Sequence, residues 1–305
     1  MTKTIQPDIY ARVTDRIITA LESGVAPWVR PWQSEVDPIP INAESRRTYR
    51  GVNFITLQLT AQACGYWRNC WMTYRQAEQH GGRVRKGEHG VPVVFWKLNR
   101  VNAKAETEPW PQETRLFENV VPLLRYYTVF NTAQIEGLPA ALADPVPSIP
   151  QWQGHDVADE LIQLSGARIR HAGGQAFYAP ADDYVQLPTM TSFREASDYY
   201  ATALHELAHW TGHSSRLNRR LGKRFGDEAY AMEELIAELG SAFLCAHCRI
   251  EGQLQHASYI EHWLKVLRAD KRAIFVASTK AQNAADFLTV KLAPAESETV
   301  LAAAA

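Results

Sequence analysis

His205-Glu206-Leu207-Ala208-His209 is the stretch that decides the fold of the second half of the chain, because its spacing is that of a zinc site carried on a helix. Side chains four apart on a helix share one face, so His205 and His209 can present two imidazoles to a single metal ion. Glu206 would then lie beside the ion, in position to take a proton from water. The string also arises by chance in apolar helices, where its histidines form only a polar face. The helical pattern that begins at Arg194 and an acidic helix downstream both favour the metal site.

The downstream helix supplies the candidates for a third metal ligand, in the run Glu233-Glu234-Leu235-Ile236-Ala237-Glu238. Glu234 and Glu238 share a face, so one can bind the metal while the other holds a histidine ring. We predict Glu234 as the ligand and Glu238 behind it, with the reverse order as the alternative. His213 is a minor alternative, because on a continuous helix it lies ~12 Å from His205 at ~1.5 Å per residue, too far to share one ion.

Three protein ligands leave one coordination position open, which is typical of a catalytic rather than a structural zinc site. The sequence therefore predicts a hydrolase with Glu206 as general base, in the form of a zinc-dependent metallopeptidase, with another divalent ion such as manganese as the alternative. A strand predicted at 183–187 lies just upstream of the helix, and we expect it to pair with an extended peptide. Tyr230 is a candidate donor to the developing oxyanion, although a packing or surface role is the commoner one for a tyrosine.

The composition is that of an ordinary water-soluble protein. The chain has 305 residues, of which 46% are hydrophobic and 21% charged, and its net charge is -1. No stretch approaches the roughly 20 apolar residues of a membrane span, so we expect no membrane partner. The first residues lack the apolar core of a signal peptide, so we expect a cytoplasmic protein with free thiols. Cys245 and Cys248 have the spacing of half a zinc knuckle, but they continue an apolar helical pattern and we predict that they pack in the core.

The length favours two domains at roughly 100 to 200 residues each. Residues 137–153 contain four prolines and no periodic pattern, which is typical of an interdomain linker. Both sides mix helical and strand patterns, so we predict an α+β fold, with one domain at 1–136, a second at 154–292 that contains a small antiparallel sheet, and a frayed tail at 293–305. The predicted elements are helices at 7–21, 53–64, 73–80 and 156–165, strands at 91–98 and 123–131 around a polar excursion at 102–115, strands at 167–171, 175–179 and 183–187, and then mostly helix to about 290.

Basic and aromatic residues are interleaved between positions 41 and 100, where 10 Lys and Arg stand against 3 Asp and Glu. Such a mixture suits single-stranded DNA, because cations follow the phosphates while rings stack on unpaired bases. The alternative is an ordinary domain whose aromatic residues form the core and whose arginines are solvated. No established nucleic-acid-binding signature decides between the two, and composition alone favours them equally.

Longer motifs in both halves resemble those of one known family. In the first half they are Tyr49-Arg-Gly51 followed by Asn53, the string Trp71-Met-Thr-Tyr-Arg-Gln-Ala-Glu-Gln-His-Gly-Gly-Arg-Val-Arg-Lys-Gly87, and Val129-Phe-Asn-Thr-Ala-Gln-Ile-Glu-Gly-Leu138. In the second half they are His205-Glu-Leu-Ala-His-Trp-Thr-Gly-His213 and Tyr230-Ala-Met-Glu-Glu-Leu-Ile-Ala-Glu238. The chain resembles the ArdC-type antirestriction proteins over nearly its whole length.

The resemblance implies a plasmid-encoded protein of DNA transfer, in which the first domain binds single-stranded DNA and the second is a gluzincin-like metallopeptidase domain. It also implies a protein partner, either the host restriction enzyme or another protein held on DNA. The alternatives are a DNA-coating module whose metal site is not catalytic, and an accessory to plasmid priming or replication, since TraC-type primases carry a related domain. Within the basic and aromatic stretch, the residues expected to contact DNA are Arg46, Arg47, Tyr49, Arg50, Asn53, Trp71, Tyr74, Arg83, Arg85 and Lys86.

Overall fold

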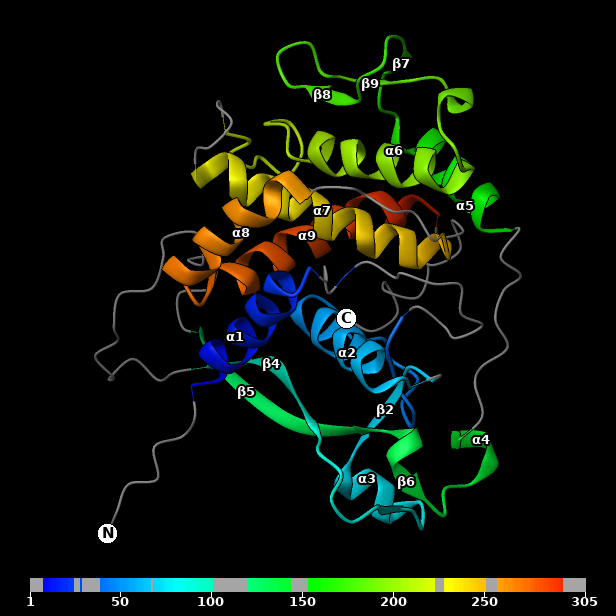
Figure 1. The fold of residues 1–305 in the computed structure, drawn as a ribbon, viewed down its shortest axis with the longest axis vertical. Coiled ribbons are helices and arrows are strands. Elements are labelled where there is room, and N and C mark those ends of the chain that lie inside the picture. Colours follow the sequence, from blue (N-terminus) through cyan, green and yellow to red (C-terminus); the bar gives the residue numbers. More distant parts are fainter. Residues whose placement is uncertain are drawn as a thin grey trace.

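The structure, a computed structural model, is shown in Figure 1. It describes residues 8–24, 28, 39–66, 68–100, 120–143, 153–222, 228–250 and 257–292. The predicted polar excursion at 102–115, most of the predicted linker and the predicted tail lie outside these ranges. Within them, helices and short sheets are mixed, as the α+β prediction required. No helix in this part of the chain combines the length and the apolar character needed to cross a bilayer.

A block of helices centred on α7 forms most of the second half (Figure 1). It comprises α5 (Gln153–Ser165), α6 (Ala196–Thr211), α7 (Glu228–Cys248), α8 (Ala257–Ala269) and α9 (Ala273–Thr289), and it ends in the 3-10 turn η4 (Val290–Leu292). The helix α7 contacts α6, α8 and α9, which agrees with its apolar side chains on several sides. Leu235 and Leu239 of α7 are fully buried. A Cβ on Gly240 would approach the Cβ of Ala208 to 3.1 Å, so the missing side chain lets α6 and α7 pack closely.

A small sheet covers the outer side of α6 (Figure 1). Its strands are β7 (Ile169–His171), β8 (Phe177–Ala179) and β9 (Tyr184–Leu187), in the spatial order β7-β9-β8, and the 3-10 turn η3 (Met190–Ser192) leads from it to α6. The sheet was expected to be antiparallel, but it is mixed, because β9 pairs with β8 as a hairpin and then runs parallel to β7. The expected docking strand is also wrong: β9 is hydrogen-bonded on both edges and cannot accept a peptide, whereas β8 is an edge strand of this sheet.

The first half folds around a four-stranded sheet with the order β1-β2-β5-β4. β1 runs parallel to β2, and the other neighbours are antiparallel. α3 begins at a capping box formed by Thr73 and Gln76, in agreement with the predicted helix. The elements are α1 (Ile9–Glu22), β1 (Ile41–Asn42), α2 (Val52–Cys64), β2 (Cys70–Thr73), α3 (Tyr74–Gln79), β3 (Arg83–Val84), β4 (Val91–Arg100), β5 (Val120–Asn131), the 3-10 turn η2 (Thr132–Gln134), β6 (Ile135–Glu136), which pairs with β3, and α4 (Ala140–Ala143).

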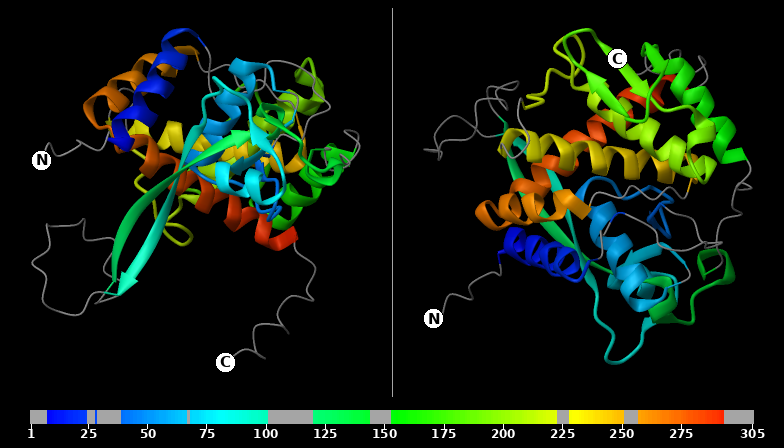
Figure 2. Two further views of the ribbon diagram at one scale, coloured as in Figure 1. Left: turned by 90° about the horizontal axis from the view of Figure 1, so that it is seen from below. Right: turned by 45° about the horizontal axis from the view of Figure 1, so that its top comes forward.

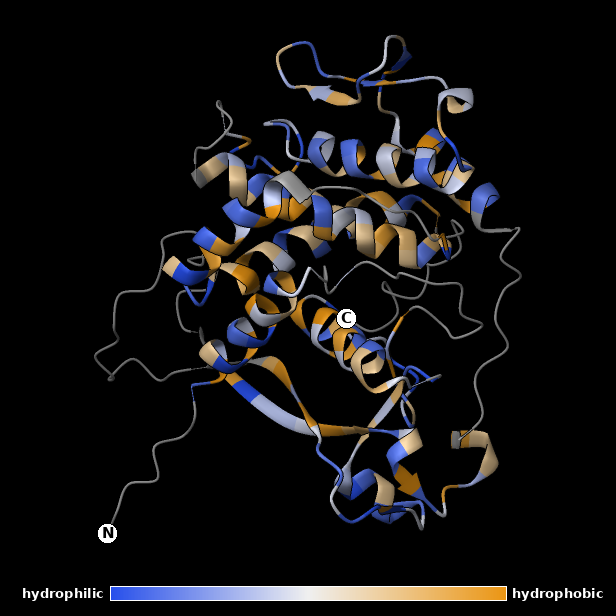
Figure 3. Cartoon of the chain, in the orientation of Figure 1, coloured by the Kyte–Doolittle hydropathy of each residue, from blue (hydrophilic) through white to orange (hydrophobic). Residues whose placement is uncertain are grey.

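The helix α2 joins this sheet to the helical block. Most of its side chains are buried, and Figure 3 shows it mainly in the orange of apolar residues. Phe54 of α2 meets Phe243 of α7 edge to face, with 5.0 Å between the ring centroids. Beside it, α1 packs against α8, and the Thr14 hydroxyl donates to the Lys271 carbonyl at 2.7 Å. The largest hydrophobic core therefore contains residues from both predicted domains, and the boundary between them remains a prediction.

The strands β4 and β5 continue beyond the sheet as a two-stranded arm (Figure 2). β2 pairs with β5 only from Val129 to Asn131, so the preceding part of β5 pairs with β4 alone. The left view of Figure 2 shows the two strands reaching away from the helices. A two-stranded ribbon has no further layer of its own to cover its faces, and among the described side chains of this part Phe95, Arg125, Tyr126 and Tyr127 are exposed to water.

Candidate metal centre and nucleic-acid surface

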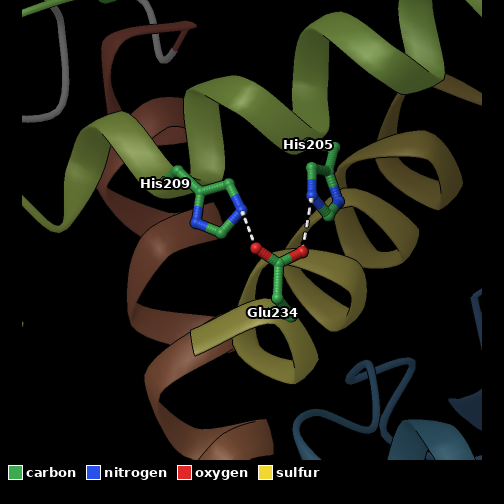
Figure 4. Close-up of side chains that lie close together, drawn as sticks. All are labelled: His205, His209 and Glu234. Carbon is green, nitrogen blue, oxygen red and sulfur yellow. Dashed lines mark ion pairs between the residues drawn. The ribbon is translucent and has the colours of Figure 1, made fainter. Parts of the chain in front are cut away.

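Three side chains from two helices converge beside the small sheet (Figure 4). His205 and His209 project from one face of α6, and Glu234 projects from α7 towards both rings. Glu234 Oε2 lies 3.7 Å from His205 Nε2, and Glu234 Oε1 lies 3.6 Å from His209 Nε2. With one ligand atom taken from each residue, the three atoms lie within 4.8 Å of one another. Atoms at this separation fit around one ion, since zinc ligands stand at about 2 Å from the metal.

A further carboxylate lies behind each histidine ring. Glu238 Oε2 is 3.6 Å from His205 Nδ1, and Glu233 Oε1 is 3.2 Å from His209 Nδ1. A carboxylate hydrogen-bonded to Nδ1, as Glu233 is, fixes the tautomer of a ring and turns its Nε2 towards a metal, whereas Glu238 lies slightly beyond hydrogen-bond distance of His205 Nδ1. The three glutamates of α7 therefore face different ring atoms: Glu234 faces both Nε2 atoms, and the other two face the Nδ1 atoms.

Glu233 is the member of this group to which the sequence prediction assigned no role. Arg219, from the segment after α6, holds it through hydrogen bonds of 2.7 and 3.0 Å to its two oxygens. The same guanidinium donates to the Ala208 carbonyl and the Thr211 hydroxyl, and so fixes the end of α6. No sequence signal separates Glu233 from its neighbours, because its role depends on where the segment that carries Arg219 closes over α6.

Burial and contacts between opposite charges shift the pKa values of this cluster. Burial raises the pKa of Glu234, but its interactions with His205 and His209 outweigh burial and hold that pKa well below the usual range. Burial lowers the pKa of His209, but its contacts with Glu233 and Glu234 reverse this effect and raise the pKa to about 10. Burial raises the pKa of Glu238 to about 7. Carboxylates concentrated in a poorly solvated site favour a bound cation.

The cluster lines a cavity of about 310 Å³. Glu206 also faces this cavity and is itself buried. Burial raises the pKa of Glu206, while the nearby histidines and the backbone N–H of Tyr178 lower it less strongly. A buried carboxylate with a raised pKa is suited to exchange protons near neutral pH. The remaining lining residues are Ala176, Phe177, Tyr178, Pro180, Leu221, Gly222, Tyr230 and Tyr259.

Two tyrosines supply hydroxyl groups to the cavity. Tyr230 comes from α7 and Tyr259 from α8, and their hydroxyl oxygens are 3.2 Å apart. Burial, together with the hydrogen bond to Tyr259, raises the pKa of Tyr230, so its hydroxyl stays protonated and able to donate. The structure thus brings the predicted donor Tyr230 to the cavity. Sequence reasoning missed Tyr259, because only the packing of α8 on α7 brings it there.

The donor set fits a divalent transition metal, because imidazole nitrogens and carboxylate oxygens are ligands that such ions accept. His213 is not a member of the cluster: α6 ends before it, and its Nδ1 shares a 2.7 Å hydrogen bond with the Ser215 hydroxyl. Cys245 and Cys248 are buried as free thiols, as predicted. Among the described residues, the candidate metal centre therefore consists of His205, His209 and Glu234.

The residues expected to contact DNA divide into a buried and an exposed set. Tyr49, Asn53 and Trp71 are buried, which corrects the prediction for these three. Trp71 packs with Tyr49 in a small core under the sheet, and its indole Nε1 donates to Asn69 at 2.8 Å. A ring enclosed in a core has no free face on which a base can stack.

The exposed set keeps its proposed contact with DNA, and its members are Arg46, Arg47, Arg50, Tyr74, Arg83, Arg85 and Lys86. Some of these cations already have protein partners. Arg50 forms an ion pair with Asp286 of α9, and Arg85 pairs with Glu88. A phosphate would have to compete with these carboxylates, so Arg50 and Arg85 are weaker candidates for DNA contact than their exposure alone indicates.

Asn53→Ala is expected to destabilise the fold without removing a DNA contact. The Asn53 side chain donates to the Val94 carbonyl at 2.7 Å and accepts from the Val94 N–H at 2.8 Å, which ties α2 to β4. The substitution leaves both backbone groups without this partner, so the free energy of unfolding should fall by about 2 to 4 kcal/mol. Chemical denaturation measures the loss. A variant of unchanged stability but reduced affinity for single-stranded DNA would contradict the structural role.

Two family models match this chain. Residues 7–130 match the N-terminal domain of anti-restriction factor ArdC, and residues 156–280 match a zincin-like metallopeptidase. The predicted linker at 137–153 lies in the interval between the two matches.

Similar proteins match along nearly the whole chain. The chain is 41% identical to the Uncharacterized protein y4eC of Sinorhizobium fredii, over 97% of this chain and 96% of that protein. It is 38% identical to a DNA primase TraC of Escherichia coli, over 93% of this chain but only 27% of the primase. The Mn(II)-bound crystal structure of the antirestriction ArdC protein from the R388 plasmid is 40% identical, with a TM-score of 0.75 over 95% of this chain and 100% of that one.

Proposed function

This chain belongs to the ArdC family of antirestriction proteins, and from that premise we propose that it protects incoming plasmid DNA by two linked activities. Its N-terminal part binds single-stranded DNA. Its zincin-like part hydrolyses peptide bonds in a protein held on that DNA, such as the host restriction enzyme. The observation that carries the peptidase activity is the convergence of two histidines, a glutamate and the buried base Glu206 on one cavity.

We assign a divalent ion, zinc in the first place, to His205, His209 and Glu234. The Mn(II)-bound structure of the R388 protein supports a divalent ion and makes manganese the alternative. When bound, such an ion supplies Lewis acidity, which polarises a carbonyl group and acidifies water. We assign Glu233 and Glu238 the positioning of the two rings, Glu233 by a hydrogen bond to His209 Nδ1 and Glu238 by its carboxylate 3.6 Å from His205 Nδ1.

Glu206 is the general base of the proposed reaction. Its carboxylate removes a proton from water and returns it to the leaving amine. Burial raises the pKa of Glu206 above its usual range, which favours its holding the proton until the amine leaves. Tyr230 and Tyr259 face the same cavity with hydroxyl groups, and we assign them the donation of hydrogen bonds to the oxyanion.

The peptide substrate is proposed to lie along the outer edge of β8. This strand borders the cavity through Phe177 and Tyr178, and in the described sheet it pairs on one side only. An extended peptide can add to such an edge through main-chain hydrogen bonds, which do not depend on its sequence. A binding mode of this kind suits a peptidase that meets different DNA-bound proteins.

The arm of β4 and β5 is proposed as the stacking surface for single-stranded DNA. The register pairs Phe95 with Arg125 and Val93 with Tyr127, so Phe95, Arg125 and Tyr127 share one face of the arm. The ring centroids of Phe95 and Tyr127 are 5.8 Å apart, and the two residues are 45% and 48% exposed. Two exposed rings beside a guanidinium suit unpaired bases and their phosphates. The sequence prediction ended at residue 100 and missed Arg125 and Tyr127, which only strand pairing brings beside Phe95.

Tyr127→Ala is expected to weaken binding of single-stranded DNA by about 1 to 3 kcal/mol, or roughly five- to 150-fold, because it removes one stacking platform. Arg125→Ala should reduce the slope of log affinity against log salt by about 0.7, the loss of one phosphate contact. Fluorescence anisotropy with a labelled oligonucleotide measures both quantities. Arg194→Ala, which removes an exposed cation near the start of α6, is the matched control and should bind as the wild type does. Wild-type affinity in Tyr127→Ala would exclude the arm from the interface.

The proposed function as a whole is tested by metal analysis combined with proteolysis. The purified chain is assayed for zinc and manganese and is then incubated with restriction-enzyme subunits in the presence of single-stranded DNA. We expect cleavage that a chelator stops and that added metal restores. A metal-loaded chain that cleaves none of these proteins, yet binds single strands, would favour the DNA-coating alternative.

A different candidate function is an accessory role in plasmid priming. The match of nearly the whole chain to a segment of the DNA primase TraC favours it. Strand-synthesis assays with and without the chain distinguish this role from protection, since only an accessory to priming should change the yield of primers.

A further inference from the structure

Trp28 belongs to the first half of the chain, but its side chain is buried among the helices of the second half. Its indole meets Trp263 of α8 edge to face, with 5.7 Å between the ring centroids. Its Nε1 donates a hydrogen bond to Glu238 Oε1 at 3.3 Å. This tryptophan therefore reaches the carboxylate that lies behind one of the proposed metal ligands.

Glu238 connects Trp28 to the candidate metal centre. One carboxylate oxygen accepts from Trp28, and the other lies 3.6 Å from His205 Nδ1. The side chains of Glu238 and His205 are only 2% and 6% exposed, so little water competes for these contacts. A carboxylate held by one fixed donor has fewer orientations to adopt, and the imidazole that faces its other oxygen is held in turn.

We propose that Trp28 is a positioning residue of the metal centre, which orients Glu238 and through it the ring of His205. The role rests on the proposed metal site. Trp28 lies within the residues that match the ArdC N-terminal domain, whereas the proposed metal ligands match the zincin-like model. The N-terminal part thus contributes one indole N–H to the support of a metal site in the other part, and the zincin-like segment alone lacks it.

The alternative is that Trp28 only fills space, since tryptophan contributes a large apolar area to any core. Trp263 provides an internal comparison, because it is a neighbour and is equally enclosed. Its Nε1 is also buried, but among the described residues it has no hydrogen-bond partner. Replacing either tryptophan by phenylalanine keeps an aromatic ring and removes the N–H. Only at Trp28 does that N–H have an acceptor in the structure.

The test measures the dissociation constants of Zn²⁺ and Mn²⁺ for the full chain, by competition with a chromophoric chelator. Trp28→Phe is expected to raise them about three- to tenfold, less than the roughly 10- to 100-fold typical when a direct partner of a ligand is removed. Trp263→Phe should leave them unchanged. Thermal unfolding of the metal-free proteins reports the packing cost of each substitution. Equal loss of metal affinity in both variants would show a general packing defect and overturn the proposal.

A double-mutant cycle shows whether Trp28 acts through Glu238. Glu238→Leu removes the acceptor, so Trp28→Phe should have almost no further effect on metal affinity in that background. Additive effects, or wild-type affinity in Trp28→Phe alone, would overturn the proposal. The wild-type chain is measured first: if it binds neither metal, the metal site itself fails, which is distinct from a chain that binds metal without help from Trp28.

Discussion

Glu206→Gln is expected to reduce peptide hydrolysis by about 10²- to 10⁴-fold, the usual contribution of a general base. An amide of the same shape cannot take a proton from water. Glu206 is not one of the three side chains that converge as the candidate metal centre, so the variant should keep the wild-type metal content. Time courses of cleavage of a DNA-bound protein, with elemental analysis of the same samples, measure both quantities.

Glu160→Gln is the matched control for this substitution, because it removes the same charge from an exposed position on α5. It should cleave as the wild type does. Undiminished cleavage by Glu206→Gln would exclude Glu206 as the base. The two variants also distinguish two modes of protection when plasmid transfer by conjugation into a restricting host is measured. If proteolysis protects the DNA, Glu206→Gln loses protection, and if coating protects it, the variant behaves as the wild type.

Glu234→Gln is expected to reduce metal affinity more than any other glutamine substitution among the glutamates of α7. Its two oxygens face Nε2 of both histidines, whereas Glu233 and Glu238 face the Nδ1 atoms. Removal of a group that only orients a ligand weakens metal binding by roughly 10- to 100-fold, and we expect this loss for Glu233→Gln and Glu238→Gln. Removal of a ligand itself, in Glu234→Gln, should weaken metal binding by more than about 100-fold. Chelator competition with Zn²⁺ measures all three.

The same series decides which glutamate is the third ligand. A larger loss in Glu238→Gln than in Glu234→Gln would reverse the assignment and make Glu234 the group that orients a ring. Glu160→Gln again serves as the control for charge, since it lies on a different helix. Single-strand affinity should stay at the wild-type value in every member of the series, because none of these residues lies on the arm of β4 and β5.

Many of the elements were predictable because their signals are local. Each signal is contained in one short segment of the sequence. Examples are the apolar stripe of α1, the capping box of α3 and the β-branched runs of β4 and β5. The small sheet shows where local signals stop. Its three strands were predicted near their positions, but not the insertion of β9 between β7 and β8, because strand order depends on pairing between separate segments.

The sequence by itself determined that His205, Glu206 and His209 lie together at one place on a helix, because helix geometry alone places residues four apart on one face. Only the tertiary structure decided that Glu234 faces the Nε2 atoms, that Glu233 lies at His209 Nδ1 and Trp28 donates to Glu238, and that Tyr49, Asn53 and Trp71 are buried. The physical reason is that neighbours within a helix follow from its period. Neighbours across helices follow from how the whole chain packs its core, to which residues far apart in the sequence contribute together.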